Sequence, residues 1–114
     1  VLYAPVDVQI TEHDIVQPDL VVVLSENRII TPTKVKGAPN HIIEILSPST
    51  EVNDKTLKRR LYEQAGVREY WIVDPQEHCV LQLVLSGARY TESTHQSQAT
   101  LSYLDITVDL TRVW

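Results

Sequence analysis

The sequence predicts an α/β domain in which a mixed β-sheet carries a crossover helix between two central strands. Short runs rich in Val, Ile and Leu, separated by turn-forming residues, predict several strands. Two of these runs, at 41–46 and 69–73, have little polar alternation, which is typical of strands that are covered on both faces. A single helical segment lies between them, and a strand, helix, strand unit normally makes its two strands parallel.

The elements follow from local patterns in chain order. Strands are expected at 6–10, 19–24, 41–46, 69–73 and 79–85, with a short one near 89–91. The segment 26–39 contains two prolines and a glycine and predicts a surface connection. A helix is expected from about Glu51 to Ala65, because residues 47–50 are capping types and Gly66 suits the position after a helix end. Leu57, Leu61 and Ala65 recur every four residues and predict the stripe that packs on the sheet.

Length and composition indicate one soluble domain over residues 1–114. Hydrophobic residues make up 43% and charged residues 22% of the chain, which is ordinary for a globular protein. The sequence contains no apolar run near the roughly 20 residues of a membrane span and no signal-peptide pattern at its start. Cys79 is the only cysteine, which excludes an internal disulfide and a cysteine-based zinc site. We therefore expect a cytoplasmic protein without a membrane association.

The charge distribution is uneven. A net charge of −5 argues against a protein that coats nucleic acid through its overall charge. Residues 28–68, however, hold eight Lys or Arg against four Asp or Glu. One part of the chain is therefore locally basic.

Three residues on successive elements could form a hydrolytic site. Asp19 opens the second strand after Pro18, Glu44 lies within the apolar third strand, and Lys58 lies on the helix. Two carboxylates can hold Mg²⁺ or Mn²⁺, and a lysine can stabilise the negative charge that develops on a phosphate. The backbone carbonyl of Ile45 is a further candidate ligand. A charge at Glu44 is costly unless it is paired or bound to a metal.

Three further residues could support this site, and each also has a structural interpretation. Asp54, Lys58 and Tyr62 are spaced four apart and form one stripe of the helix. Asp54 could contact the metal or only complement the helix dipole, and Tyr62 could serve the site or only pack. Ser47 could meet a phosphate or only start the helix.

The central residues have structural alternatives as well. Asp19 could only cap a turn after Pro18. Glu44 and Lys58 could form a structural ion pair, which is the main alternative for the whole site. Both interpretations remain open on the sequence.

The ordered motifs resemble a known family. QPDLVVV at 17–23, EILSPST at 44–50, then Asp54, Lys58, Tyr62 and Gly66-Val67, and EYWIVDP at 69–75 closely resemble the Uma family of presumed restriction endonucleases. This family, a domain of unknown function, belongs to the PD-(D/E)XK nuclease superfamily. The resemblance spans about residues 4–90 and implies a restriction-endonuclease-like fold, a divalent-metal site and DNA cleavage.

Residue by residue, the resemblance assigns the catalytic roles to Asp19, Glu44 and Lys58. Asp19 matches the aspartate of the PD motif, Glu44 the second acidic residue, and Lys58 the lysine. The position two after Glu44 is Leu46 rather than lysine, so in this family the lysine lies on the helix. Family members usually carry an N-terminal helical segment with another glutamate, which we expect this domain to lack.

The expected function is a Mg²⁺- or Mn²⁺-dependent DNA endonuclease. Cleavage of both strands would need two sites, so we expect a homodimer. The alternative is a catalytically inactive nuclease-like module that binds nucleic acid or protein. A phosphohydrolase of small nucleotides would use the same carboxylates and is a third possibility.

Overall fold

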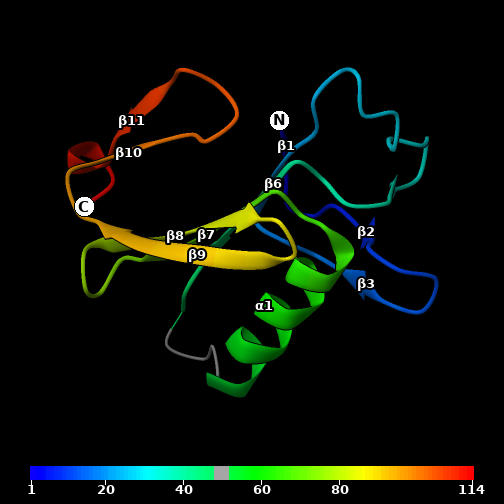
Figure 1. Cartoon of the computed structure of the whole chain (residues 1–114), viewed down its shortest axis with the longest axis horizontal. Helices are drawn as coiled ribbons and strands as arrows, with labels where there is room; N and C mark the ends of the chain where they lie inside the picture. The colour runs from blue at the N-terminus through cyan, green and yellow to red at the C-terminus, as the bar shows by residue number, and fades with distance from the viewer. Residues whose placement is uncertain (48–51) are drawn as a thin grey trace.

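The chain is organised around a six-stranded mixed sheet. In this computed structural model, the backbone is described for residues 1–47 and 52–114, and the side chains for 1–47 and 56–114. Along the sheet the strand order is β1-β4-β6-β7-β8-β9 (Figure 1). The bounds are β1 Leu2–Tyr3, β4 Leu20–Val22, β6 His41–Ile45, β7 Glu69–Asp74, β8 Cys79–Ser86 and β9 Arg89–His95. Only β6 and β7 pair in parallel, and the other neighbours in this sheet are antiparallel.

The parallel pair results from the predicted crossover helix. Helix α1, Val52–Ala65, connects β6 to β7 and lies against one face of the sheet, below it in Figure 1. Gly66 follows the helix with φ 83°, a conformation that glycine adopts without a Cβ penalty, and the N–H of Val67 donates to the carbonyl of Tyr62 at 3.0 Å. The predicted α/β fold with a mixed sheet and a crossover helix is confirmed.

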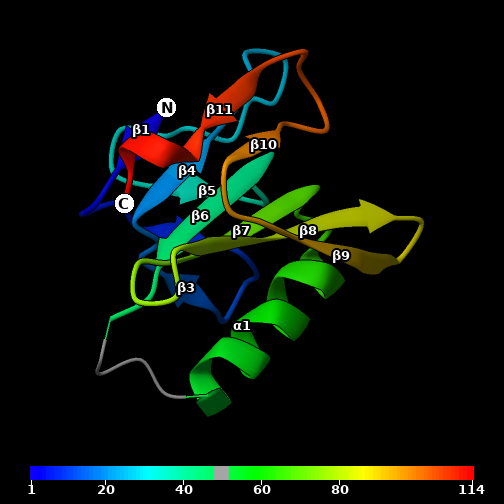
Figure 2. The ribbon, with the colours of Figure 1, turned by 90° about the vertical axis from the view of Figure 1, so that its left-hand side faces the viewer.

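The opposite face of the sheet is covered by the C-terminal segment. It comprises β10 (Gln98–Thr100), β11 (Thr107–Asp109) and the 3₁₀ helix η1 (Leu110–Arg112), and Figures 1 and 2 both place it across the sheet from α1. Trp71, Val73 and Val80 of the sheet form a small core there with Ala99 and Leu110. The two central strands are therefore covered on both faces, as their apolar pattern predicts.

Residues of β6 alternate between the two layers. Ile42 belongs to the core beneath α1, whereas Ile43 packs against the C-terminal segment. Glu44 shares the α1 side with Ile42 because side chains two positions apart in a strand point to the same face. Strand alternation therefore aims the one carboxylate of β6 at the helix.

A second, three-stranded sheet completes the α1 side. It has the order β3-β2-β5, with β2 at Val8–Gln9, β3 at Ile15–Val16 and β5 at Val35–Lys36. Val8 and Val35 are buried in the same core as Tyr62 and Tyr70. The segment 26–39 is thus more than a surface connection, because Val35, only 1% exposed, pairs with β2 and with Ile30.

Two residues of the predicted helical stripe, Leu61 and Ala65, pack against the core, and the third, Leu57, does not. Leu57 is 65% exposed, whereas Tyr62 is fully buried, and Leu61 and Ala65 are partly buried against the core. The buried face is therefore centred on Tyr62, and the prediction for Leu57 is wrong. Leu57 instead lines an open groove together with Ile15 and Val16 of β3. No helix within the described part of the chain is long and apolar enough to cross a membrane.

Candidate active site

Strand pairing brings Asp19 next to the strand that carries Glu44. Strands β4 and β6 pair with Leu20 opposite Ile43, so Asp19, one residue earlier, continues the register toward Glu44. The Oδ2 atom of Asp19 accepts the backbone N–H of Ile45 at 2.7 Å. This hydrogen bond holds Asp19 just before the start of β4 and beside β6.

Glu44 is a buried carboxylate that α1 and β7 hold from two sides. Its side chain is only 11% exposed. The ammonium of Lys58 donates to Oε1 at 3.0 Å, and the hydroxyl of Tyr70 donates to Oε2 at 2.8 Å. The hydroxyl of Tyr62 lies 3.5 Å from Oε1, at the outer limit of a hydrogen bond. These contacts compensate for the loss of hydration that would otherwise make a charge at this depth unfavourable.

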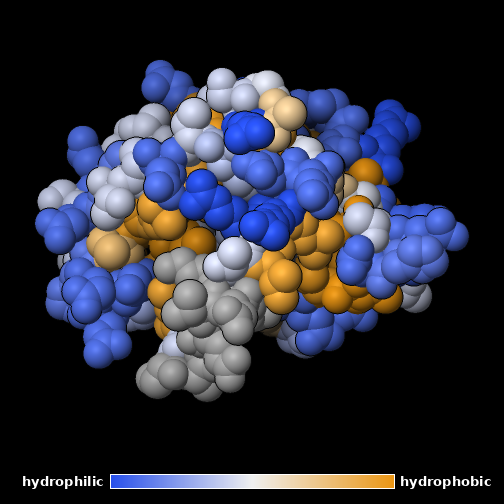
Figure 3. All heavy atoms as spheres, turned by 60° about the horizontal axis from the view of Figure 1, so that its bottom comes forward, coloured by the Kyte–Doolittle hydropathy of each residue, from blue (hydrophilic) through white to orange (hydrophobic). Residues whose placement is uncertain are grey.

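Lys58 lies at the border between the core and an open groove. Its side chain is 30% exposed, and it lines a groove of about 710 Å³ between β3 and α1. Figure 3 shows the side of the molecule that carries α1, where hydrophobic surface lies among polar residues. The remaining residues that line the groove are Asp14, Ile15, Val16, Gln17, Leu57 and Leu61. The lysine stem therefore packs on apolar surface while its amine reaches inward to Glu44.

Tyr70 is a further partner of Glu44 that the sequence motifs do not indicate. It pairs with Ile42 across the parallel strands and therefore faces α1, on the same side as Glu44. Its ring meets that of Tyr62 edge-on, with centroids 4.9 Å apart. Parallel pairing of β6 with β7, combined with strand alternation, was the signal that could have placed Tyr70 beside Glu44.

The structure gives fewer contacts for the other predicted site residues, Ile45, Ser47 and Asp54. Ile45 is 49% exposed at the end of β6 and donates its N–H to Asp19, and the role of its carbonyl stays a prediction. Ser47 is exposed just beyond β6. Asp54 lies in the first turns of α1, but its side chain is outside the described residues, so the roles predicted for it stay untested.

The oxygen donors suit a hard divalent cation. Asp19 and Glu44 offer carboxylate oxygens on neighbouring strands, next to the half-exposed residue Ile45, and Mg²⁺ prefers oxygen ligands and keeps several waters. Within residues 1–47 and 56–114, no cluster of three or more His, Cys, Asp or Glu could hold a metal ion. A cation at this position would therefore depend on two carboxylates completed by backbone oxygen and water.

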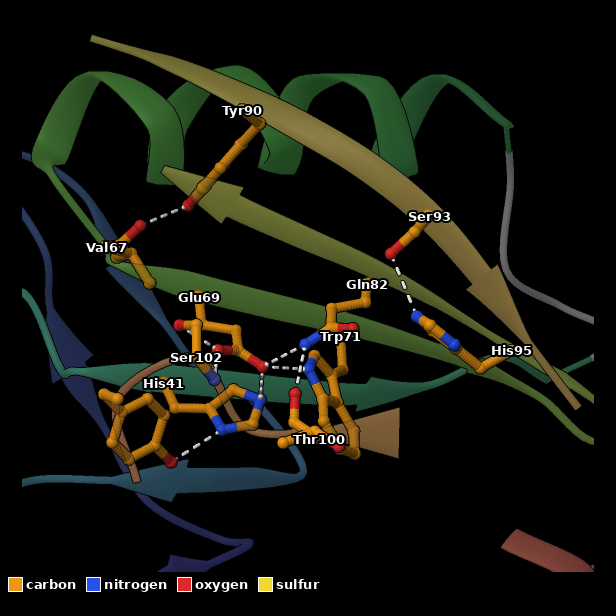
Figure 4. A network of polar contacts seen from close by, with 11 residues as sticks. His41, Val67, Glu69, Trp71, Gln82, Tyr90, Ser93, His95, Thr100 and Ser102 are labelled. Atoms are coloured by element: carbon orange, nitrogen blue, oxygen red, sulfur yellow. Dashed lines mark hydrogen bonds and ion pairs between the residues drawn. The ribbon is translucent and has the colours of Figure 1, made fainter. Parts of the chain in front are cut away.

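A second buried polar cluster lies on the opposite face of the sheet (Figure 4). Glu69, fully buried, accepts hydrogen bonds from Trp71 and from Gln82, the latter at 2.9 Å. Its other oxygen accepts the backbone N–H of Ser102 at 2.8 Å and the Ser102 hydroxyl. Gln82 also donates to the carbonyl of Thr100 at 2.8 Å. These bonds attach the C-terminal segment to the sheet, so Glu69 has a structural role.

His41 belongs to the same cluster. Its Nδ1 lies 2.8 Å from the Tyr103 hydroxyl, and its Nε2 is buried 3.9 Å from a Glu69 oxygen. Burial lowers the pKa of His41 from 6.5 to about 4, an effect that the Glu69 carboxylate partly offsets. Burial, followed by Glu69, raises the pKa of Tyr103 to about 12. Both groups are therefore neutral near pH 7.

Comparison with known proteins agrees with the fold and the motifs. A solved structure of "a putative nuclease belonging to DUF820" from Anabaena variabilis ATCC 29413 matches 96% of this chain with a TM-score of 0.75 and 18% identity. At that identity the match shows the fold alone, and the chain spans 64% of the length of that protein. No curated protein matches the chain. The model of the Uma2 family, described as "putative restriction endonuclease", matches residues 1–112. The chain is therefore a member of the Uma2 family.

Proposed function

We propose that this domain is a Mg²⁺- or Mn²⁺-dependent nuclease that hydrolyses phosphodiester bonds in DNA. The observation that carries the proposal is the ion pair between the buried Glu44 and the partly exposed Lys58, 3.0 Å apart, beside the start of β4, where Asp19 lies. An acidic residue in the core, a lysine at the edge of a groove and a second carboxylate across the strand pair supply the groups that phosphodiester hydrolysis requires. Membership of a family described as "putative restriction endonuclease" supports the same reaction.

Each residue has a distinct role in this scheme. Asp19, Glu44 and the carbonyl of Ile45 would hold the cation, which, when bound, polarises the phosphate and makes water a better nucleophile. Lys58 presents its ammonium from the helix side, where it stabilises negative charge on the phosphate oxygens. Its contact with Glu44 keeps the amine at the strand rather than in solvent.

The substrate and the assembly belong to the proposal as well. Arg28 and Lys36 are exposed on the segment 26–39, and Arg60 is exposed on α1, so cations are available for phosphate contacts. Arg59 is instead paired with Glu92 at 2.9 Å. Cleavage of both DNA strands would require two copies of the site, and a homodimer in the cytoplasm is the simplest arrangement.

A module without turnover is the second candidate, and one observation favours it. Both oxygens of Glu44 already accept hydrogen bonds from protein groups, as expected of a structural ion pair. Such a domain would bind nucleic acid or protein without cleavage and without a divalent metal. Hydrolysis of small nucleotides, the third possibility, would require the same carboxylates as cleavage of DNA.

The test combines metal binding with cleavage. Mn²⁺ and Mg²⁺ are titrated calorimetrically into the wild type and into the variants Glu44→Ala and Glu44→Gln. The matched control is Glu77→Ala, which removes an exposed glutamate from a turn away from the site. We expect both Glu44 variants to lose binding and the control to retain it. Supercoiled plasmid, single-stranded DNA, RNA and a nucleoside triphosphate are then offered with metal.

The outcomes separate the candidates. Metal-dependent nicking of plasmid that both Glu44 variants lose supports the nuclease. Cleavage that survives in Glu44→Gln, or a wild type that binds no metal, overturns it. DNA binding without metal, unchanged in Glu44→Ala, supports the module without turnover, and turnover of the triphosphate alone supports the third possibility.

A further inference from the structure

We infer that Tyr70 is a positioning residue, whose hydroxyl fixes the Glu44 carboxylate so that Oε1 is the oxygen presented to a cation. This inference rests on the proposed function. The hydroxyl of Tyr70 donates to Oε2 at 2.8 Å, whereas Lys58 occupies Oε1 at 3.0 Å. The two oxygens of one carboxylate are thus distinguished by their partners.

Tyr70 is built into the fold more rigidly than Lys58, the other main partner of Glu44. It lies on a central strand, is 1% exposed, and contacts the fully buried ring of Tyr62 edge-on. Lys58 is 30% exposed on a flexible stem. A donor on a strand with a packed ring retains its direction when a lysine moves, so Tyr70 sets the orientation of the carboxylate.

The consequence concerns how Glu44 can bind a metal. With Oε2 held by Tyr70, a cation would meet Glu44 through Oε1, the oxygen that Lys58 contacts from the edge of the groove. Partners that orient a metal ligand typically change metal affinity or activity by about 10- to 100-fold when they are removed. Removal of this single hydroxyl is therefore expected to weaken metal binding without removing any ligand.

The matched control is another buried tyrosine hydroxyl. Tyr90 is 7% exposed and donates to the carbonyl of Val67 at 2.7 Å, in the same core but away from Glu44. Tyr70→Phe and Tyr90→Phe each remove one buried hydroxyl. Both should lower the melting temperature, and only the first should change metal affinity.

The experiment measures the Kd for Mn²⁺ and the melting temperature of both variants in the full chain. We expect Tyr70→Phe to raise the Kd by roughly 10- to 100-fold, and Tyr90→Phe to leave it within about twofold of the wild type. A Tyr70→Phe variant that binds Mn²⁺ like the wild type overturns the inference. An equal rise in the Kd for Mn²⁺ in both variants also overturns the inference, because that result would indicate general destabilisation.

A metal-free measurement distinguishes this inference from the proposed function. Melting temperatures are compared for Tyr70→Phe, Glu44→Ala and the double variant, with Glu44→Gln replacing the alanine if that variant does not fold. Effects that are not additive show that the hydroxyl acts on the carboxylate. A wild type that binds no Mn²⁺ refutes the proposed function and, with it, the part of the inference that concerns the cation. Additive effects in the metal-free measurement overturn the action of the hydroxyl on the Glu44 carboxylate, even if the wild type binds Mn²⁺.

Discussion

Acidification should destabilise this domain through His41, in a pH range where few other groups titrate. The imidazole is fully buried, and burial lowers its pKa from 6.5 to about 4. The unfolded chain therefore binds a proton at pH values at which the folded chain does not. Stability linked to His41 is complete above pH 6.5 and is lost as the pH falls toward 4.

The magnitude follows from the two pKa values. A difference of one pKa unit corresponds to 1.36 kcal/mol, so a fall from 6.5 to about 4 is equivalent to about 3 kcal/mol once both states are protonated. Between pH 7 and pH 5 the loss is about 2 kcal/mol, because the unfolded histidine is then almost fully protonated and the folded one is not. In urea this corresponds to a midpoint lower by about 1 M.

The assay is urea unfolding of the wild type and His41→Asn at pH 7 and pH 5. The asparagine side chain places a polar atom near the position of Nδ1, the atom that contacts the Tyr103 hydroxyl, but asparagine does not titrate. We expect the wild type to lose about 2 kcal/mol more than the variant over this pH range. Equal losses in the two proteins would refute the assignment, because carboxylates and the other three histidines are common to both.

Two further changes give clear expectations. Lys58→Met removes the ammonium that lies 3.0 Å from Oε1 of Glu44. Because the ammonium and a bound Mn²⁺ would repel each other, the variant should bind Mn²⁺ more tightly in calorimetry, while plasmid cleavage is lost. Weaker binding of Mn²⁺ by the variant would contradict this expected repulsion. Gly37→Ala adds a Cβ 2.9 Å from Ile29 at φ 131° and should lower the free energy of unfolding by about 1–3 kcal/mol. Gly87→Ala, at φ 65°, adds a Cβ that meets no atom within 4 Å, so it should lower the free energy of unfolding less than Gly37→Ala in the same urea measurement. Equal losses of stability in the two variants would show that the contact with Ile29 is not the cause.

The conflict at Leu57 shows where local patterns fail. Leu57, Leu61 and Ala65 fit a helical stripe, yet Leu57 is 65% exposed and Tyr62 takes the buried position. A spacing of four residues defines a face, but it does not say which of two adjacent faces meets the sheet. The volume beneath the sheet decided that, and it accommodates the tyrosine ring.

The shortest strands and the contacts of the buried polar groups could not be predicted from the sequence either. Strands β1, β3, β10 and β11 have only two or three residues, too few for any periodic signal. Glu69 begins strand β7, and nothing in the neighbouring residues indicates that Ser102, distant along the chain, will bind it. Hydrogen bonds between distant segments depend on topology rather than on neighbouring residues.

By itself, the sequence determined the fold class and predicted Asp19, Glu44 and Lys58 as candidates for the site. The apolar runs of β6 and β7 and the capped helix between them imply a parallel pair, because a crossover helix leaves little other choice. Only the tertiary structure decided which atoms meet. It placed the Lys58 amine on one oxygen of Glu44 and the Tyr70 hydroxyl on the other, because strand register and helix rotation set side-chain contacts that no spacing encodes.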